Sequence, residues 1–143
     1  MRTLLLRTFR HALGAALLLA GTACGGDAPT GRDEGSIAGD YTLRTINGRS
    51  LPYTMLSAGV NQTEVLSSSL SLAADGTFRE ERSMRRTHAG VSITEAELKF
   101  GTYTSTGSGV TFRATTGVQV SGTRGGGGSV TFAEDGLTFV YGR

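Results

Sequence analysis

The chain has 143 residues, with 14 basic and 12 acidic side chains, 22 glycines, two prolines and one cysteine. This length suits one ordinary domain, and the many glycines, with abundant Ser and Thr, favour short strands joined by turns. A single cysteine excludes an intramolecular disulfide, so packing and hydrogen bonds must stabilise the fold.

Residues 1–23 have the composition of a secretory signal peptide. Three arginines, Arg2, Arg7 and Arg10, precede an apolar run over residues 12–20 that ends in small residues. Spanning a bilayer takes roughly 20 apolar residues, and this run covers about half of that length. A stable transmembrane helix is therefore not expected.

Cys24 follows this leader and resembles the lipidated cysteine of bacterial lipoproteins. That pattern places Leu three residues before the cysteine, whereas this chain has Gly21 there. The alternative is ordinary cleavage at the small residues Gly21 and Ala23, which would give a secreted or periplasmic protein with a free thiol. Gly25 rather than Asp follows the cysteine, and the resemblance then implies the outer membrane of a Gram-negative cell, with the membrane bound through the lipid on Cys24.

Removal of the leader changes the net charge of the protein. Three of the 14 basic residues lie in the leader, so 11 remain against 12 acidic residues and the net charge becomes −1. Nucleic-acid binding depends on many basic side chains that neutralise phosphates. No nucleic-acid partner is therefore expected.

Residues 24–36 contain almost no apolar side chain and are expected to be a flexible tether. The folded domain is expected over residues 37–143, where apolar and polar side chains alternate with the period of β-strands. Asn47-Gly48 indicates a tight turn, and Pro52, which lacks an amide donor, marks the start or edge of a strand.

The clearest alternation places Leu66, Leu70 and Leu72 on one face of a strand, and Ser67, Ser69 and Ser71 on the other. Residues 57–64 are the one ambiguous stretch. Further strands are expected at residues 77–87, 95–104, 109–115, 118–123, 129–133 and 137–141.

A short motif that ends in Thr-Phe recurs after four turns and gives Phe78, Phe112, Phe132 and Phe139. Consecutive hairpins that each supply an aromatic ring to a shared interior predict an all-β, antiparallel meander of about eight strands, closed into a small up-and-down β-barrel. The expected core comprises Tyr41, Leu43, Leu70, Leu72, Phe78, Leu98, Phe100, Phe112, Phe132 and Phe139.

Several stretches resemble small lipocalin-like (calycin-type) bacterial lipoproteins. They are Gly39-Asp40-Tyr41-Thr42-Leu43, residues 46–52, residues 70–78 and Gly101-Thr102-Tyr103, with Tyr41 where lipocalins carry the Trp of Gly-x-Trp. The resemblance covers most of residues 37–143. It implies a lipocalin-like barrel and a non-enzymatic protein.

The densest group of charges spans residues 79–88. If Phe78 points into the barrel, the period of two carries Glu80 and Arg82 inward as well. The interior would then be polar, and Arg82 could hold an anionic head group through its fork of donors. Alternatively, the strand leaves the barrel or bulges, and the charges form pairs in water, which contribute roughly 0–1 kcal/mol.

No motif for catalysis or metal binding stands out. His88 is the one histidine after the leader, and it lies beside Ala89-Gly90 in an expected loop without a Gly-x-Ser-x-Gly elbow anywhere in the chain. One histidine and one cysteine cannot supply the usual zinc ligands. Asp75-Gly76 and Asp135-Gly136 are expected turns, and residues 125–128 an expected hairpin tip. Neither an enzyme nor a cofactor is expected.

Two functions remain open. In the first, a lipid-anchored barrel binds a small hydrophobic or amphipathic ligand, with Tyr41, Glu80, Arg82 and Phe112 as candidate contact residues. In the second, a filled barrel acts as a structural or interaction protein of the cell envelope through a protein partner. A cavity of about 300 Å³ or more, the low end for ligand pockets, would distinguish the two.

Overall fold

The structure is a computed structural model that describes residues 36–143. The expected signal peptide, Cys24 and all of the expected tether except Ser36 lie outside the described residues. Within residues 36–143 no helix is long and apolar enough to cross a membrane.

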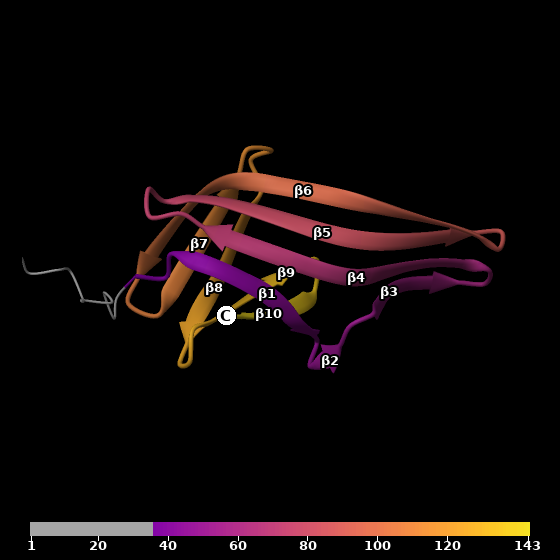
Figure 1. The fold of residues 1–143 in the computed structure, drawn as a ribbon, viewed down its shortest axis with the longest axis horizontal. Helices are drawn as coiled ribbons and strands as arrows, with labels where there is room; N and C mark the ends of the chain where they lie inside the picture. Colours follow the sequence, from indigo (N-terminus) through magenta and orange to yellow (C-terminus); the bar gives the residue numbers. More distant parts are fainter. Residues whose placement is uncertain (1–35) are drawn as a thin grey trace, which may run out of the picture. The chain divides into compact units, whose positions relative to one another are not determined.

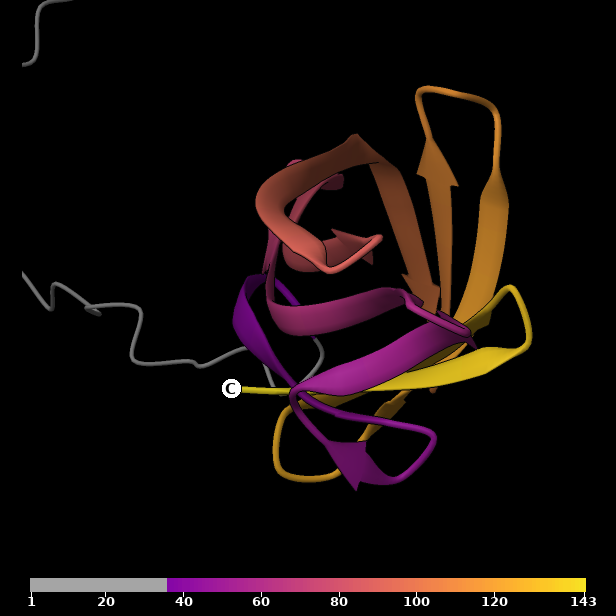
Figure 2. The ribbon, with the colours of Figure 1, turned by 90° about the vertical axis from the view of Figure 1, so that its right-hand side faces the viewer.

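The described chain forms one antiparallel sheet of ten strands (Figure 1). They are β1 (Gly39–Ile46), β2 (Arg49–Ser50), β3 (Tyr53–Ala58), β4 (Asn61–Leu72), β5 (Thr77–His88), β6 (Val91–Thr106), β7 (Gly109–Ala114), β8 (Gln119–Gly125), β9 (Ser129–Glu134) and β10 (Leu137–Gly142). From β3 to β10 each strand pairs with the next, and β1 pairs with both β10 and β4. Eight strands, β1 and β4 to β10, therefore close into the all-β barrel that the sequence predicts, seen from its end in Figure 2.

Two hairpins are longer than expected. The ambiguous residues 57–64 form the hairpin between β3 and β4, and β6 begins at Val91 instead of residue 95. β6 pairs with β5 along Val91–Thr102 but with β7 only along Gly101–Thr106. Within the part of the chain described, no strand pairs with the outer edge of β6 at residues 91–99, and this free edge leaves a gap in the wall of the barrel.

The four phenylalanines of the recurring motif all point into the barrel, as predicted. Their rings form a continuous group, with centroid distances of 5.3 Å between Phe78 and Phe112, 5.4 Å between Phe112 and Phe132, and 5.7 Å between Phe132 and Phe139. Aromatic pairs at such distances stabilise a core beyond the area that they bury.

Leu98 and Phe100 were expected in the core, and this prediction is wrong: the two side chains are 50% and 55% exposed. The register between β5 and β6 explains the error. Lys99 lies directly opposite Glu80, and Leu98 opposite Glu81. Residues that face each other across an antiparallel pair share one side of the sheet, so the inward side chain of Glu80 takes Lys99 inward and leaves Leu98 outside.

A β-bulge changes the expected alternation in β4. The pairing of β4 with β5 shifts register between Val65 and Ser67, and a bulge of this kind moves side chains to the other face. Val65 is fully buried and Leu66 only half-buried. Leu66 therefore does not share the inner face of β4 with Leu70 and Leu72, and the regular inward alternation begins at Ser68.

Glycine allows close contact between strands at two points in the wall. A Cβ atom at Gly101 would clash with the backbone oxygen of Arg113, and one at Gly122 with the backbone oxygen of Thr131. Gly101 is the residue at which β6 first pairs with β7. The end of the gap in the wall is therefore set by a residue without a side chain.

Replacing Phe112 with Ala is expected to lower the free energy of unfolding by about 3–5 kcal/mol, because it removes a buried ring from the core. Chemical denaturation measures this change. Phe100→Ala, on the exposed side of β6, is the matched control and should change stability by no more than about 0.5 kcal/mol. Equal losses for the two variants would contradict this assignment of faces.

Candidate functional site

A cavity of about 430 Å³ lies at the gap in the barrel wall. Its inner surface is apolar and consists mainly of Leu70, Phe78, Phe112 and Phe132. Three of these are the phenylalanine rings described above, so the cavity reaches the core of the barrel.

The outer rim of the cavity is also apolar. Leu98, Phe100 and Val118 line it, and each is at least half exposed. Leu98 and Phe100 come from the free edge of β6, and Val118 from the turn between β7 and β8. These side chains, unexpected on a surface, are explained by their position beside an opening.

One end of the cavity is polar and charged. Glu80 from β5, Glu97 and Lys99 from β6, and Glu134 and Asp135 at the end of β9 line it. The antiparallel register brings the first three together, because Lys99 lies opposite Glu80 and Glu97 lies opposite Arg82. The apolar and the charged parts together form an amphipathic cavity.

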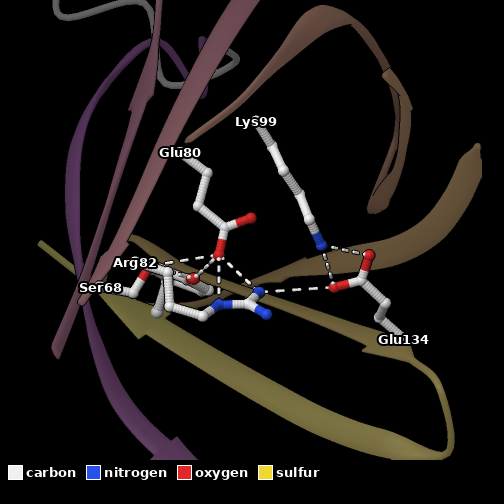
Figure 3. Close-up of polar contacts among 6 residues, drawn as sticks. Ser68, Glu80, Arg82, Lys99 and Glu134 are labelled. Carbon is white, nitrogen blue, oxygen red and sulfur yellow. Dashed lines mark hydrogen bonds and ion pairs between the residues drawn. The ribbon is translucent and has the colours of Figure 1, made fainter. Parts of the chain in front are cut away.

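Glu80 and Arg82 form an ion pair (Figure 3). Glu80 lines the cavity and Arg82 lies behind its wall, and each residue is only 4% exposed. Arg82 donates to Oε1 of Glu80 from both a terminal nitrogen, at 2.7 Å, and Nε, at 3.2 Å. The inward orientation follows from Phe78 on the same strand, as the sequence suggests. The alternative, charges paired in water, describes the far end of β5, where Arg86 pairs with Glu95 and both are exposed.

Two hydroxyl groups complete the shell of Glu80. The Tyr141 hydroxyl donates to Oε1 at 2.7 Å, and the Ser68 hydroxyl donates to it at 3.1 Å. Burial and the negative charge of Glu80 raise the pKa of Tyr141 above its ordinary value of 10.0, so this hydroxyl remains a donor at neutral pH.

The second oxygen of Glu80, Oε2, has no hydrogen-bond partner among residues 36–143. Figure 3 shows it pointing away from Arg82, on the side of Lys99. Because Glu80 lines the cavity, the free oxygen is a carboxylate acceptor at the charged end of that cavity.

Arg82 has further contacts behind this wall. It also contacts Oε2 of Glu134 at 3.4 Å, and its guanidinium lies 4.7 Å from the centre of the Phe139 ring. Burial acts to lower the pKa of Arg82, but attraction and hydrogen bonding from Glu80 outweigh it and hold the pKa above its ordinary value. Arg82 therefore keeps its charge at neutral pH.

Lys99 and Glu134 form a second ion pair across the charged end. Nζ of Lys99 lies 2.6 and 2.7 Å from the two oxygens of Glu134. Burial acts to raise the pKa of Glu134, but the hydrogen bond and charge of Lys99, with the charge of Arg82, lower it below 4.5. Glu134 is thus a carboxylate with both oxygens in use.

The structure brings only part of the predicted ligand contacts to the cavity. Glu80 and Phe112 line it, whereas Arg82 lies behind its wall. Tyr41 lies elsewhere: its hydroxyl donates to the backbone oxygen of Ile37 at 2.6 Å, and its ring packs on Arg143.

Sequence reasoning missed four charged cavity residues: Glu97, Lys99, Glu134 and Asp135, the last of which it assigned only to a turn. The period of two within β6 places Glu97 and Lys99 on one face. Because Leu98 and Phe100 are apolar, the sequence predicted that their face, and not that of Glu97 and Lys99, points inward. His88 is exposed at the end of β5. Among residues 36–143, no three His, Cys, Asp or Glu side chains are grouped to hold a metal ion.

Replacing Glu134 with Gln is expected to lower the free energy of unfolding by about 1.5–3 kcal/mol at pH 7, since it removes charge-assisted hydrogen bonds. The folded-state pKa of Glu134 lies below 4.5, so its stabilisation is complete above that pH and is lost as the pH falls through the folded value. Denaturation of both proteins from pH 7 to pH 2 should show the difference shrinking below pH 4.5.

Glu81→Gln is the control, because Glu81 forms an exposed ion pair with Arg79. It should change the free energy of unfolding by less than about 1 kcal/mol. A Glu134→Gln difference that is as large at pH 2 as at pH 7 would contradict the proposed stabilisation.

No family model matches the chain, and neither a curated protein nor a solved structure matches it. The function of the cavity is therefore inferred from its own side chains.

Proposed function

We propose that this protein is a non-catalytic, lipid-anchored barrel of the cell envelope that binds a small hydrophobic or amphipathic ligand. The observation that carries this proposal is the cavity of about 430 Å³ with apolar and charged parts. Ligand pockets typically measure about 300–1,000 Å³ and combine an apolar lining with a few polar groups.

The apolar surface of the cavity supplies the binding free energy in this proposal. Removing apolar surface from water contributes about 25 cal/mol per Å². A ligand seated against Phe78, Phe112 and Phe132 would also cover the exposed rim at Leu98 and Phe100. Exposed apolar side chains beside a groove are a common sign of a ligand or partner site.

A second candidate, the interaction protein, has support from the free edge of β6. Residues 91–99 carry backbone groups on that edge that no described strand pairs with, and Val91 and Ile93 are exposed there. A partner strand could add to such an edge. The ligand-binding proposal is preferred because the cavity reaches the core.

Anchoring through Cys24 would hold the barrel close to the membrane. If residues 24–36 form the tether that the sequence predicts, these thirteen residues would have a root-mean-square reach of roughly 20 Å. The proposed location is the periplasmic face of the outer membrane. Secretion or release to the periplasm remains the alternative.

Native mass spectrometry of the protein purified from its own host tests ligand binding. The expected result is an added mass of a few hundred daltons that is lost on denaturation. Ala114→Phe, which places a ring in the cavity wall, should abolish the added mass. Ala133→Phe, on an exposed position of β9, is the matched control and should retain it.

A protein that carries no added mass, and that binds none of the probes described below, would overturn the ligand-binding proposal. The search would then move to a protein that pairs with β6.

Replacing Cys24 with Ser tests the anchor. The variant should leave the membrane fraction, and its intact mass should lack the lipid that the unaltered protein carries. Unchanged fractionation of the two proteins, with no lipid on either, would contradict lipidation and favour ordinary secretion.

A further inference from the structure

We propose that the ligand is cationic: a small amphipathic amine or ammonium that donates to Oε2 of Glu80, in a cavity whose wall also carries Glu97 and Asp135, while its apolar part fills the rest of the cavity. This inference rests on the proposed ligand-binding function. It specifies the chemical class of the ligand.

The charge balance of the cavity favours a cation. Among its described lining residues are four carboxylates, Glu80, Glu97, Glu134 and Asp135, and one ammonium, Lys99. Arg82 behind the wall adds one more positive charge. Four negative against two positive charges leave an excess of two negative charges.

The buried carboxylate of Glu80 gives independent evidence. Its side chain is only 5% exposed, and all four of its hydrogen bonds reach Oε1. Oε2 has no donor within the described residues and lies on the cavity side (Figure 3). Every buried side-chain N or O atom of residues 36–143 has a hydrogen-bond partner, so Oε2 is open to the cavity. A ligand N–H group there can donate to it.

Two further carboxylates add negative charge to the wall of the cavity. Glu97 is half-buried and Asp135 exposed, and neither side chain forms a hydrogen bond or ion pair within residues 36–143. Both line the same cavity as Glu80. The charge-assisted hydrogen bonds that they could accept from an ammonium are about twice as strong as neutral ones.

An anionic head group, the ligand class that the sequence suggested through Arg82, fits this wall poorly. The guanidinium is held by Glu80 and Glu134 and stacks on Phe139. Lys99 is held by both oxygens of Glu134. An anion would have to break these pairs and approach like charges.

The apolar part sets the size of the ligand. A water molecule takes up about 30 Å³ in the liquid, so a cavity of about 430 Å³ has room for roughly a dozen non-hydrogen atoms. The rings of Phe78, Phe112 and Phe132 suit an alkyl or aryl group, and a cation near a ring face gains further attraction.

Three probes with the same phenyl ring and four-carbon chain separate charge from size: 4-phenylbutylamine, 4-phenylbutanol and 4-phenylbutanoate. Isothermal titration calorimetry at pH 7 would use the mature chain from residue 24, with Cys24→Ser to avoid detergent. The amine should bind at least about tenfold more tightly than the alcohol, which corresponds to one charge-assisted hydrogen bond. The carboxylate should bind more weakly than the alcohol.

Variants test the assigned carboxylates. Glu97→Gln combined with Asp135→Asn should weaken amine binding about tenfold or more and leave alcohol binding unchanged. Both residues lie outside the buried ion pair, and Asn tolerates the positive φ of 51° at residue 135. Glu81→Gln removes the same type of charge from the outer face of β5 and should leave amine binding unchanged.

The outcomes separate the two proposals. Binding of the alcohol or the carboxylate as tightly as the amine would overturn the cationic ligand and retain the binding function. Equal weakening by Glu81→Gln and by the cavity variants would also overturn it. Failure of all three probes to bind would overturn the cationic ligand, and together with a protein free of added mass it would overturn the binding function.

Discussion

A single carboxylate oxygen, Oε1 of Glu80, connects three strands of the barrel. It accepts hydrogen bonds from Arg82 on its own strand, from Tyr141 on β10 and from Ser68 on β4. Moving a carboxylate and a guanidinium out of water costs several kcal/mol per ion, and the cost is recovered only when the geometry and the surrounding hydrogen bonds are good. The opposite walls of the barrel must therefore meet at this oxygen in one fixed arrangement.

The cavity follows from the same constraint. Because Glu80 faces inward, the antiparallel register turns Lys99 and Glu97 inward and leaves Leu98 and Phe100 on the rim. Because β6 pairs with β7 only from Gly101 onward, the wall beside these residues stays open. The register between β5 and β6 thus gives the cavity its charged end. The start of β6–β7 pairing at Gly101 leaves its entrance open.

Much of the fold could be predicted from local patterns, since strand period and turn residues are local properties. The recurring motif correctly predicted that Phe112 and Phe132 point into the barrel. The faces of β6 could not be predicted, because apolar character favoured Leu98 whereas the register with β5 decided for Lys99. The contact of Lys99 with Glu134 joins strands that are not neighbours in the sheet, so no pattern within either strand could reveal it.

The open edge of β6 has a consequence for how copies of this protein meet. An unpaired strand edge is a template for another chain, and such edges promote aggregation unless charges interrupt them. Residues 91–99 carry Glu95, Glu97 and Lys99 along this edge. Pairing of two copies there would take these charged side chains out of water, which costs free energy. Glu97 and Lys99, which give the cavity part of its charge, thus also disfavour pairing of two copies along this edge.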